Sequence, residues 1–381
     1  MTVLITWKRV VAVIVLAGLL GLGVAFSGVV PIAASSGHWA ITYWFLHTVM
    51  RRSVAFHAPE EPPPPLGDPA LIHRGAGHFA TGCAPCHGAP GEERSPVVRE
   101  MTPEPPYLPP KIPTWEPNEL FWIVRHGVKY SGMPAWPALH RKDEVWAVTA
   151  FLLSLPELDE AGYRELALGP VAKPAPTEVG AGGLAALDDP LEVALRDCAR
   201  CHGRDGLGRG VGAFPPLPTQ TETYLHLTLD AFARGERQSG IMETAAARVD
   251  AETRRRLAEH YARPPASGTL PSQPADRPPA DADLVLGKLL VEVGRPKAGI
   301  PPCLECHQSD DRDRYPAYPS LDGQTAEYLR TQLELFRDGA RGGTPYAHIM
   351  TTVAGRMRDA DIAAAAAWFA RRHESRRAAD G

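Results

Sequence analysis

The longest hydrophobic run of the chain lies near its N-terminus. Lys8 and Arg9 precede an uncharged stretch from Val10 to Ala34. As a helix rising 1.5 Å per residue, this stretch is long enough to cross a hydrocarbon core about 30 Å thick. Positive charge on the short leading side predicts that this end faces the cytoplasm and that the rest of the chain is exported. A cleaved signal peptide is the competing interpretation, because the small residues at 33–35 suit a signal peptidase, although its apolar region is usually shorter.

An aromatic segment and a proline-rich segment come after this run. Residues 38–57 are rich in Trp, Tyr and Phe and contain Arg51 and Arg52. This composition is typical of a helix at a membrane interface, and a docking surface for a partner subunit is the alternative. We expect the histidines of this segment to face solvent or the interface, since no cysteine pair accompanies them. Residues 59–69 predict a stiff polyproline-like spacer that holds the later part of the chain away from the membrane.

Helical periodicity recurs in three later regions. Apolar positions at helical spacing predict a helix from Arg141 to Leu155. A second predicted helix opens with Asp250 as its N-cap. A third carries Asp359 and Asp361 in its first turn and basic residues in its last, which complements the helix dipole. Each helix closes a unit of similar size, so the chain is predicted to be all-α.

Segments rich in Pro, Gly and Ala separate these units. The predicted organisation is a membrane anchor and interfacial segment at 1–66, a first unit at 67–165, a linker at 166–189, a second unit at 190–264, a linker at 265–280 and a third unit at 281–376.

Length and charge narrow the possible classes of protein. The chain has 381 residues, enough for two or three domains at typical domain sizes. The net charge is −4, and 22% of residues are charged. Because nucleic-acid binding would show as a basic patch or stripe, we expect no nucleic-acid partner.

The cysteines give the sharpest chemical signal. The chain has six, and all lie in three Cys-x-x-Cys-His motifs, which leaves none for a structural disulfide. Two thiols three positions apart on a helical turn face the same side. They can form thioethers with the two vinyl groups of one haem, and the following His then lies beneath the macrocycle, where it can bind iron. The motif is the signature of c-type haem attachment. The prediction is three covalently bound haem c groups, with attachment by Cys83, Cys86, Cys198, Cys201, Cys303 and Cys306 and proximal iron ligands His87, His202 and His307.

Two other uses of paired cysteines fit the sequence less well. A zinc site needs further Cys or His at finger-like spacing, so a Cys-rich site would have to combine motifs from different units. A thioredoxin-like redox pair needs a βαβ context, and no such pattern surrounds any motif.

Each unit also offers a methionine as the sixth iron ligand. Met133, Met242 and Met350 lie at similar distances after the three motif histidines and before the closing helices. Met357 is a rival to Met350, but its place beside the last helix favours a packing role. Histidine is the alternative sixth ligand, with candidates at His126, His226, His260 and His348. Ligation by His and Met raises the potential of haem iron and fills both axial positions. The pattern therefore predicts electron transfer, with no catalytic residue.

Each unit resembles the small class I c-type cytochromes. Residues 190–375 resemble the tandem dihaem cytochromes of the c4 type, through "CARCHGRDGLG", "CLECHQ" and recurring Tyr-Leu, Phe and Gly-x-Arg positions. These positions are Tyr224, Phe232, Gly235, Tyr328, Phe336 and Gly339. Residues 67–160, with "GCAPCHG" and "HGVKYSGMPAW", resemble the monohaem c subunits of bacterial haem–copper oxidases. The third unit departs from the pattern in Gln308, where the other motifs have Gly, and in the longer lead "VEVGRPKAGIPP".

The resemblance implies three tandem cytochrome c domains in the periplasm, behind a helix in the bacterial inner membrane with its N-terminus inside. The first hypothesis is a trihaem relay from a quinol-oxidising complex or soluble donor to a terminal haem–copper oxidase. The second is the cytochrome subunit of a membrane-bound flavin- or quinoprotein dehydrogenase that passes electrons to quinone. The third is a haem peroxidase or nitrite reductase, which requires an iron with an open or labile sixth position.

Overall fold

The computed structural model describes residues 6–169, 189–210, 212–264, 281–307 and 315–380. Within these ranges the structure contains helices and two isolated β-bridges but no strand, which confirms the predicted all-α class. Most of the predicted linker 166–189, and all of 265–280, lie outside the described residues.

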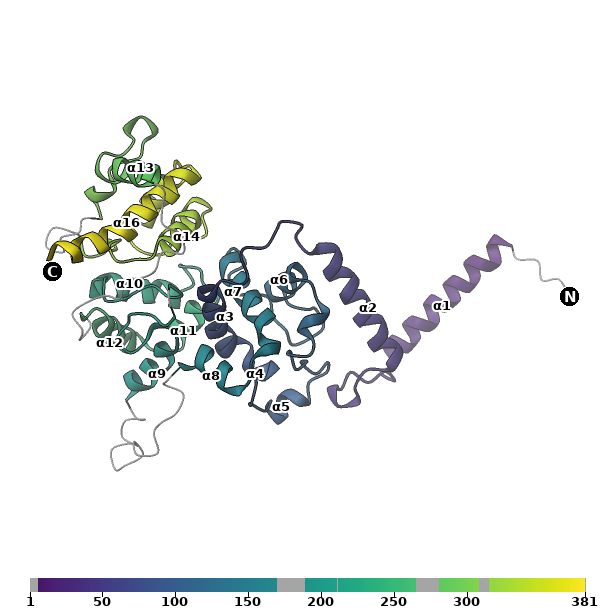
Figure 1. Ribbon diagram of the computed structural model, residues 1–381. Helices are drawn as coiled ribbons and strands as arrows, with labels where there is room; N and C mark the ends of the chain where they lie inside the picture. Colours follow the sequence, from purple (N-terminus) through teal and green to yellow (C-terminus); the bar gives the residue numbers. More distant parts are fainter. Residues whose placement is uncertain (1–5, 170–188, 211, 265–280, 308–314, 381) are drawn as a thin grey trace, which may run out of the picture.

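Two helices precede three groups of helices (Figure 1). The leading pair is α1 (Trp7–Ser27) and α2 (Ala40–His57), joined through the 3₁₀ turn η1 (Ala34–Ser36). Unit 1 contains α3 (Pro69–Gly82), α4 (Ala84–His87), α5 (Pro96–Arg99), η2 (Ile112–Thr114), α6 (Pro117–His126), α7 (Lys142–Ser154), η3 (Leu155–Glu157) and α8 (Glu160–Ala167). Unit 2 contains α9 (Pro190–His202), α10 (Glu222–Ala233), α11 (Met242–Ala247) and α12 (Ala251–Tyr261). Unit 3 contains α13 (Asp281–Glu292), η6 (Pro296–Ala298), η7 (Cys303–Glu305), α14 (Ala326–Arg337), α15 (Ala347–Ala354) and α16 (Asp359–Asp380).

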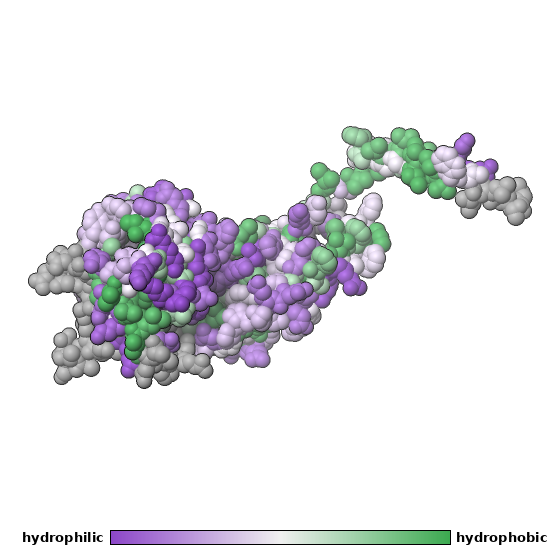
Figure 2. Space-filling view, turned by 90° about the horizontal axis from the view of Figure 1, so that it is seen from above, coloured by the Kyte–Doolittle hydropathy of each residue, from purple (hydrophilic) through white to green (hydrophobic). Residues whose placement is uncertain are grey.

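Helix α1 forms an apolar arm outside the three units (Figures 1 and 2). Its 21 residues span about 32 Å, and none of them is buried. It is long and apolar enough to cross a membrane. The helix stops at Ser27, before the end of the predicted apolar run, because Gly28 adopts a left-handed conformation with φ of 73°.

Helix α2 is attached to unit 1 by its C-terminal half. Val54 is fully buried, and the Arg51 guanidinium donates to the Thr114 carbonyl at 3.1 Å and lies 4.2 Å from the Trp115 ring centre. The N-terminal half remains exposed, with aromatic side chains that include Trp44 at 61% exposure. The C-terminal half of α2 therefore packs on unit 1, whereas the aromatic side chains of its N-terminal half remain exposed and can contact a membrane or another protein.

The proline-rich segment also runs against unit 1. The Asn118 amide donates to the carbonyl of Pro59 at 2.6 Å and to that of Glu61 at 3.1 Å. The segment is therefore bound to unit 1 at Asn118, and its role in holding unit 1 away from the membrane stays a prediction. Helix α2 itself packs on α6, so the spacer connects two parts that already touch.

Each unit is built around its own crossing of helices. Helix α3 packs on α7 in unit 1, α9 on α12 in unit 2, and α13 on α16 in unit 3. The three predicted helices are confirmed as α7, α12 and α16, although α8 follows α7 in unit 1, and Asp250 caps α12 by accepting from the Thr253 amide at 2.7 Å. The three hydrophobic cores are separate.

Two glycines allow the closest of these crossings. A Cβ atom on Gly75 of α3 would collide with the backbone carbonyl of Ala147 on α7. In unit 3, a Cβ on Gly287 would collide in the same way with the carbonyl of Ala364 on α16. In units 1 and 3 the backbones of the paired helices therefore touch, which packs the helix that precedes the motif against the later helix.

We expect Gly75→Ala to destabilise unit 1 by roughly 1–3 kcal/mol, because neither backbone can yield without shifting a packed helix. The control is Gly82→Ala in the same helix, where a Cβ meets nothing within 4 Å. Gly82→Ala should raise the free energy of unfolding by up to about 1 kcal/mol, since alanine has a higher helix propensity than glycine. Thermal unfolding followed by circular dichroism measures both. Equal effects of the two substitutions would contradict the backbone contact.

Candidate haem-binding sites

The three Cys-x-x-Cys-His motifs each lie on a helical turn. The first forms α4, the second ends α9, and the third starts on the 3₁₀ turn η7. In the first and third motifs the His amide donates to the carbonyl of the first Cys, from His87 to Cys83 and from His307 to Cys303, both at 2.9 Å. One short turn thus carries both thiols and the imidazole of a motif.

Two of the three motif histidines are oriented by a hydrogen bond at Nδ1. Nδ1 of His87 bonds the Pro106 carbonyl at 2.9 Å, and Nδ1 of His307 bonds the Pro319 carbonyl at 2.9 Å. Such bonds fix the ring orientation and tautomer, and at His87 the bond leaves Nε2 for a metal. In unit 2, Nδ1 of His202 is buried without a hydrogen-bond partner among the described residues, and burial lowers the pKa of this histidine to about 4. A neutral imidazole is the form that binds iron.

The cysteine thiols do not have the properties of a redox pair. All six are free and half-buried. Burial raises the pKa of Cys83 and Cys198 to about 12, and that of Cys201 and Cys303 to about 11. Reactive Cys-x-x-Cys pairs have lowered thiol pKa values instead. In the part of the chain that the structure describes, no group of three or more His, Cys, Asp or Glu residues could hold a metal ion by itself. Paired thiols beside an oriented imidazole fit covalently attached haem.

The methionine candidates occupy three different local structures. Met133 lies in the loop after α6, Met242 is the first residue of α11, and Met350 lies within α15, all half-buried. Met357 is 6% exposed and belongs to the hydrophobic core of unit 3, as its predicted packing role requires. The Met101 methyl group lies against Gly132, so the structure places a second thioether near Met133 that the sequence did not indicate.

Two strained residues precede these methionines. Among the described residues, Tyr130 and Tyr346 are the non-glycine positions with positive φ, at 62° and 65°. Tyr130 comes three residues before Met133, and Tyr346 comes four before Met350. Left-handed conformations of bulky residues are costly and concentrate at functional sites. Their positions support a functional role for the segments that carry Met133 and Met350.

The alternative histidine ligands are placed less favourably. His126 and His348 are exposed, and the His126 ring lies tilted against Trp122 with ring centres 5.1 Å apart. Nε2 of His260 bonds the Arg204 carbonyl at 2.7 Å. His226 lies 3.5 Å from the Asp230 carboxylate on its own helix.

Units 1 and 2 meet directly at the second motif. A Cβ on Gly77 of α3 would lie 2.8 Å from the Cys201 sulfur and 3.5 Å from the Phe214 ring. The Arg209 guanidinium crosses the same boundary and donates to the Glu165 carbonyl of α8 at 2.5 Å. The sulfur predicted to attach the second haem therefore packs on a helix backbone of unit 1.

Units 2 and 3 exchange hydrogen bonds in a near-symmetric way. The Gln220 side chain bonds the amide and carbonyl of Ser320 at 3.0 and 2.9 Å. Gln324, its counterpart in unit 3, donates to the Pro216 carbonyl at 2.9 Å. Ser320 directly follows Pro319, whose carbonyl orients His307. The contact between the units is thus one residue away from the loop that holds a predicted iron ligand.

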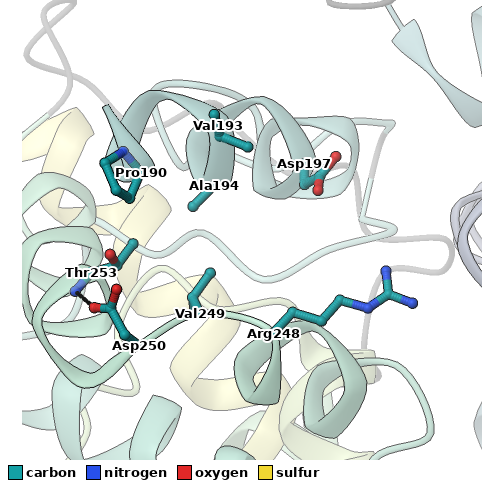
Figure 3. A pocket seen from close by; sticks show the side chains of 8 residues that line it. All are labelled: Pro190, Val193, Ala194, Asp197, Arg248, Val249, Asp250 and Thr253. Carbon is teal, nitrogen blue, oxygen red and sulfur yellow. Dashed lines mark hydrogen bonds between the residues drawn. The ribbon is translucent and has the colours of Figure 1, made fainter. Parts of the chain in front are cut away.

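A groove of about 360 Å³ lies on unit 2, between α9 and the start of α12 (Figure 3). Its lining includes Val193 and Asp197 of α9 and Val249 and Thr253 on the other side. None of the predicted iron ligands or haem-attaching cysteines lines it, so this groove is separate from the candidate haem sites.

Comparison with known proteins agrees with this site chemistry. A family model described as cytochrome c oxidase, cbb3-type, subunit III matches residues 70–152, and the cytochrome c model matches residues 301–371. The chain is 35% identical over 181 residues to a thiosulfate dehydrogenase electron acceptor of Thiomonas intermedia, covering 48% of this chain and 80% of that protein. It is 30% identical over 177 residues to cytochrome c4 of Azotobacter vinelandii, covering 45% of this chain and 82% of that protein. A thiosulfate dehydrogenase structure from Marichromatium purpuratum matches with 32% identity and a TM-score of 0.39, covering 48% of this chain and 38% of that one.

Helical units with thioether-forming motifs define an electron-transfer cytochrome. The chain belongs to the class I c-type cytochromes.

Proposed function

We propose that this chain is a membrane-anchored periplasmic cytochrome with three covalently bound haem c groups that relays electrons in a respiratory chain. The middle unit is then a third cytochrome c domain beside the two that the family models match. Each bound haem supplies one-electron exchange between ferric and ferrous iron. The protein supplies attachment, ligands, burial and spacing.

The proposed sites follow the three units. Haem attachment is assigned to Cys83 and Cys86, to Cys198 and Cys201, and to Cys303 and Cys306. The proposed axial pairs are His87 with Met133, His202 with Met242, and His307 with Met350. Filled axial positions favour electron transfer over chemistry at the iron.

The observation that carries this proposal is the contact of each unit with the next. The Cys201 sulfur lies on the backbone of Gly77, and the loop that orients His307 is bonded to unit 2 through Ser320. Haems attached at these motifs would follow one another through packed protein. A chain of separate domains on flexible tethers would lack such contacts.

The comparisons support a direction for the relay. Unit 1 lies in the region similar to subunit III of cbb3-type oxidases, and it is nearest α1. Two of the relatives are named as electron acceptors of thiosulfate dehydrogenase. We therefore propose that units 2 and 3 accept electrons from a periplasmic dehydrogenase or soluble donor and that unit 1 passes them to a terminal haem–copper oxidase.

The haem content tests the core of the proposal. We expect three haems per chain by pyridine haemochrome assay, and an intact mass increased by three haem groups. Alanine at both Cys198 and Cys201 should lower this count to two. Alanine at Ser154, which lies outside all motifs, is the control and should leave it at three. A wild-type count of two that alanine at Cys198 and Cys201 leaves unchanged would remove unit 2 from the relay.

Purification in mild detergent tests the partner and the membrane. A copper-containing oxidase that co-purifies with the full chain supports the proposed direction. A flavin- or quinoprotein subunit in its place would point to the dehydrogenase alternative, with quinone as acceptor. The intact N-terminal mass distinguishes a retained α1 from a cleaved signal.

A further inference from the structure

A buried carboxylate from unit 1 reaches into unit 2. Glu144 lies in the first turn of α7 and is 4% exposed. It belongs to no motif and is none of the predicted ligands. Burial raises its pKa, and the positive charge of Arg141 acts in the opposite direction. Burying a carboxylate costs free energy unless hydrogen bonds or ion pairs compensate, so the partners of Glu144 indicate its role.

Four donors surround this carboxylate, two from each unit. From unit 1, the Trp136 indole donates to Oε2 at 3.1 Å, and the Arg141 guanidinium lies 2.9 Å from Oε1. From unit 2, the Ser239 hydroxyl donates to Oε1 at 2.6 Å and the Gly240 amide donates to Oε2 at 2.7 Å. Both oxygens of the Glu144 carboxylate therefore accept their full set of hydrogen bonds only when residues 239–240 of unit 2 pack against unit 1.

The same turn holds Met242. The Ser239 hydroxyl, which donates to Glu144, accepts from the Met242 amide at 3.1 Å. Ile241, between them, packs against the hydrophobic core of unit 1. Gly240 lies against the Trp136 ring, so a Cβ at this position would collide with the indole. The position of the first turn of α11 is thus determined by side chains of the neighbouring unit.

Among the described residues, unit 3 shows no such support at the corresponding place. Ile349 precedes Met350 as Ile241 precedes Met242, but it is 39% exposed. The methionine segment of unit 3 lies at the surface, whereas that of unit 2 is covered by unit 1.

We propose that Glu144 is a positioning residue for Met242 and that unit 1 thereby sets the sixth ligand of the iron in unit 2. The link runs from the carboxylate through the Ser239 hydroxyl to the Met242 backbone. This inference rests on the proposed His202 and Met242 ligation. It implies that separation of units 1 and 2 loosens an iron ligand as well as a protein contact.

The test is Glu144→Ala in the full haem-loaded chain. We expect three haems per chain to remain, while the Met–iron charge-transfer absorption falls from the intensity of three haems to that of two. Nuclear magnetic resonance should show loss or broadening of the shifted methyl signal from one axial methionine. A role limited to stability would lower the unfolding temperature and leave all three signals intact before unfolding.

Asp143→Ala is the matched control. Asp143 is adjacent, carries the same charge and binds Arg141 at 2.8 and 2.9 Å, but its hydrogen bonds with the described residues stay within unit 1. It should retain three Met–iron signals. Ser239→Ala cuts the link on the unit 2 side, so it should reproduce the loss even if the Glu144 variant fails to fold. Glu144→Ala combined with Ser239→Ala should lose no more than either single change.

The outcomes separate the two proposals. A wild type without three haems or three Met–iron signals would overturn the proposed ligation. A wild type with three signals that Glu144→Ala and Ser239→Ala both leave unchanged would overturn the role of Glu144 alone.

Discussion

Met350→His is expected to remove the Met–iron absorption of one haem and to lower the potential of that haem alone. Methionine stabilises ferrous iron relative to imidazole, so His/Met ligation gives the higher potential. Axial ligands tune haem potentials over about 0.8 V, and this exchange should move one of three steps by a substantial part of that span. Spectroelectrochemical titration of the full chain measures both changes.

The control uses the rival methionine of the same unit. Met357→Leu conserves volume in the core of unit 3 and should cost less than about 1.5 kcal/mol. Because Met357 is buried among Ile362, Phe369 and other apolar side chains, all three Met–iron signals should persist. If Met357→Leu removes a signal and Met350→His does not, the ligand assignment is reversed. If neither changes the spectrum, the exposed His348 becomes the candidate to replace next.

The sequence predicted the features that depend on local spacing. A turn places two thiols and an imidazole together whatever surrounds it, so the three motifs lie on helical turns as expected. Apolar periodicity and the Asp250 cap likewise determined the closing helices. The core position of Met357 followed from its place beside the last helix.

Contacts between distant segments were not predictable in this way. Gly77 has the same local pattern as other helical glycines, and only the fold brings the Cys201 sulfur against it. Glu144 looked like an ordinary acidic residue in a first helical turn, where it would favour the helix dipole. The proline content likewise predicts a stiff spacer but says nothing about the Asn118 amide that binds this segment to unit 1.

The segment that precedes the third motif is held in place by a contact of this kind, between residues far apart in the sequence. Its turn from Arg295 to Ile300 closes by two backbone hydrogen bonds of 2.7 and 3.2 Å, just before Cys303. Arg295 binds both oxygens of Asp361 at 2.8 and 2.5 Å, and Asp361 is fully buried. The same carboxylate accepts from the backbone amide of Arg358 at 3.1 Å and so caps α16. One side chain thus joins the closing helix to the segment that presents the third motif.

Asp361→Asn is therefore expected to destabilise unit 3 by about 3 kcal/mol, because it leaves Arg295 half-buried beside a neutral amide. The control, Asp359→Asn in the same helical turn, should cost at most about 1 kcal/mol, since the Asp359 side chain is 90% exposed in its pair with Arg337. Thermal unfolding of the haem-loaded chain gives the magnitudes. Hydrogen exchange should place the change in 295–300 and the start of α16.

The pH dependence identifies the mechanism. Hydrogen bonds from Arg358 and Arg295 hold the pKa of Asp361 well below its usual value of 3.8, against the opposing effect of burial. A depressed folded-state pKa stabilises the fold above the unfolded value, and this contribution is lost as the pH falls toward the folded value. The stability difference between wild type and Asp361→Asn should thus be full at neutral pH and shrink below about pH 4. If this stability difference stays constant down to about pH 2, the substituted amide disturbs packing. The charge of the Asp361 carboxylate would then not be what holds α16 to the third motif.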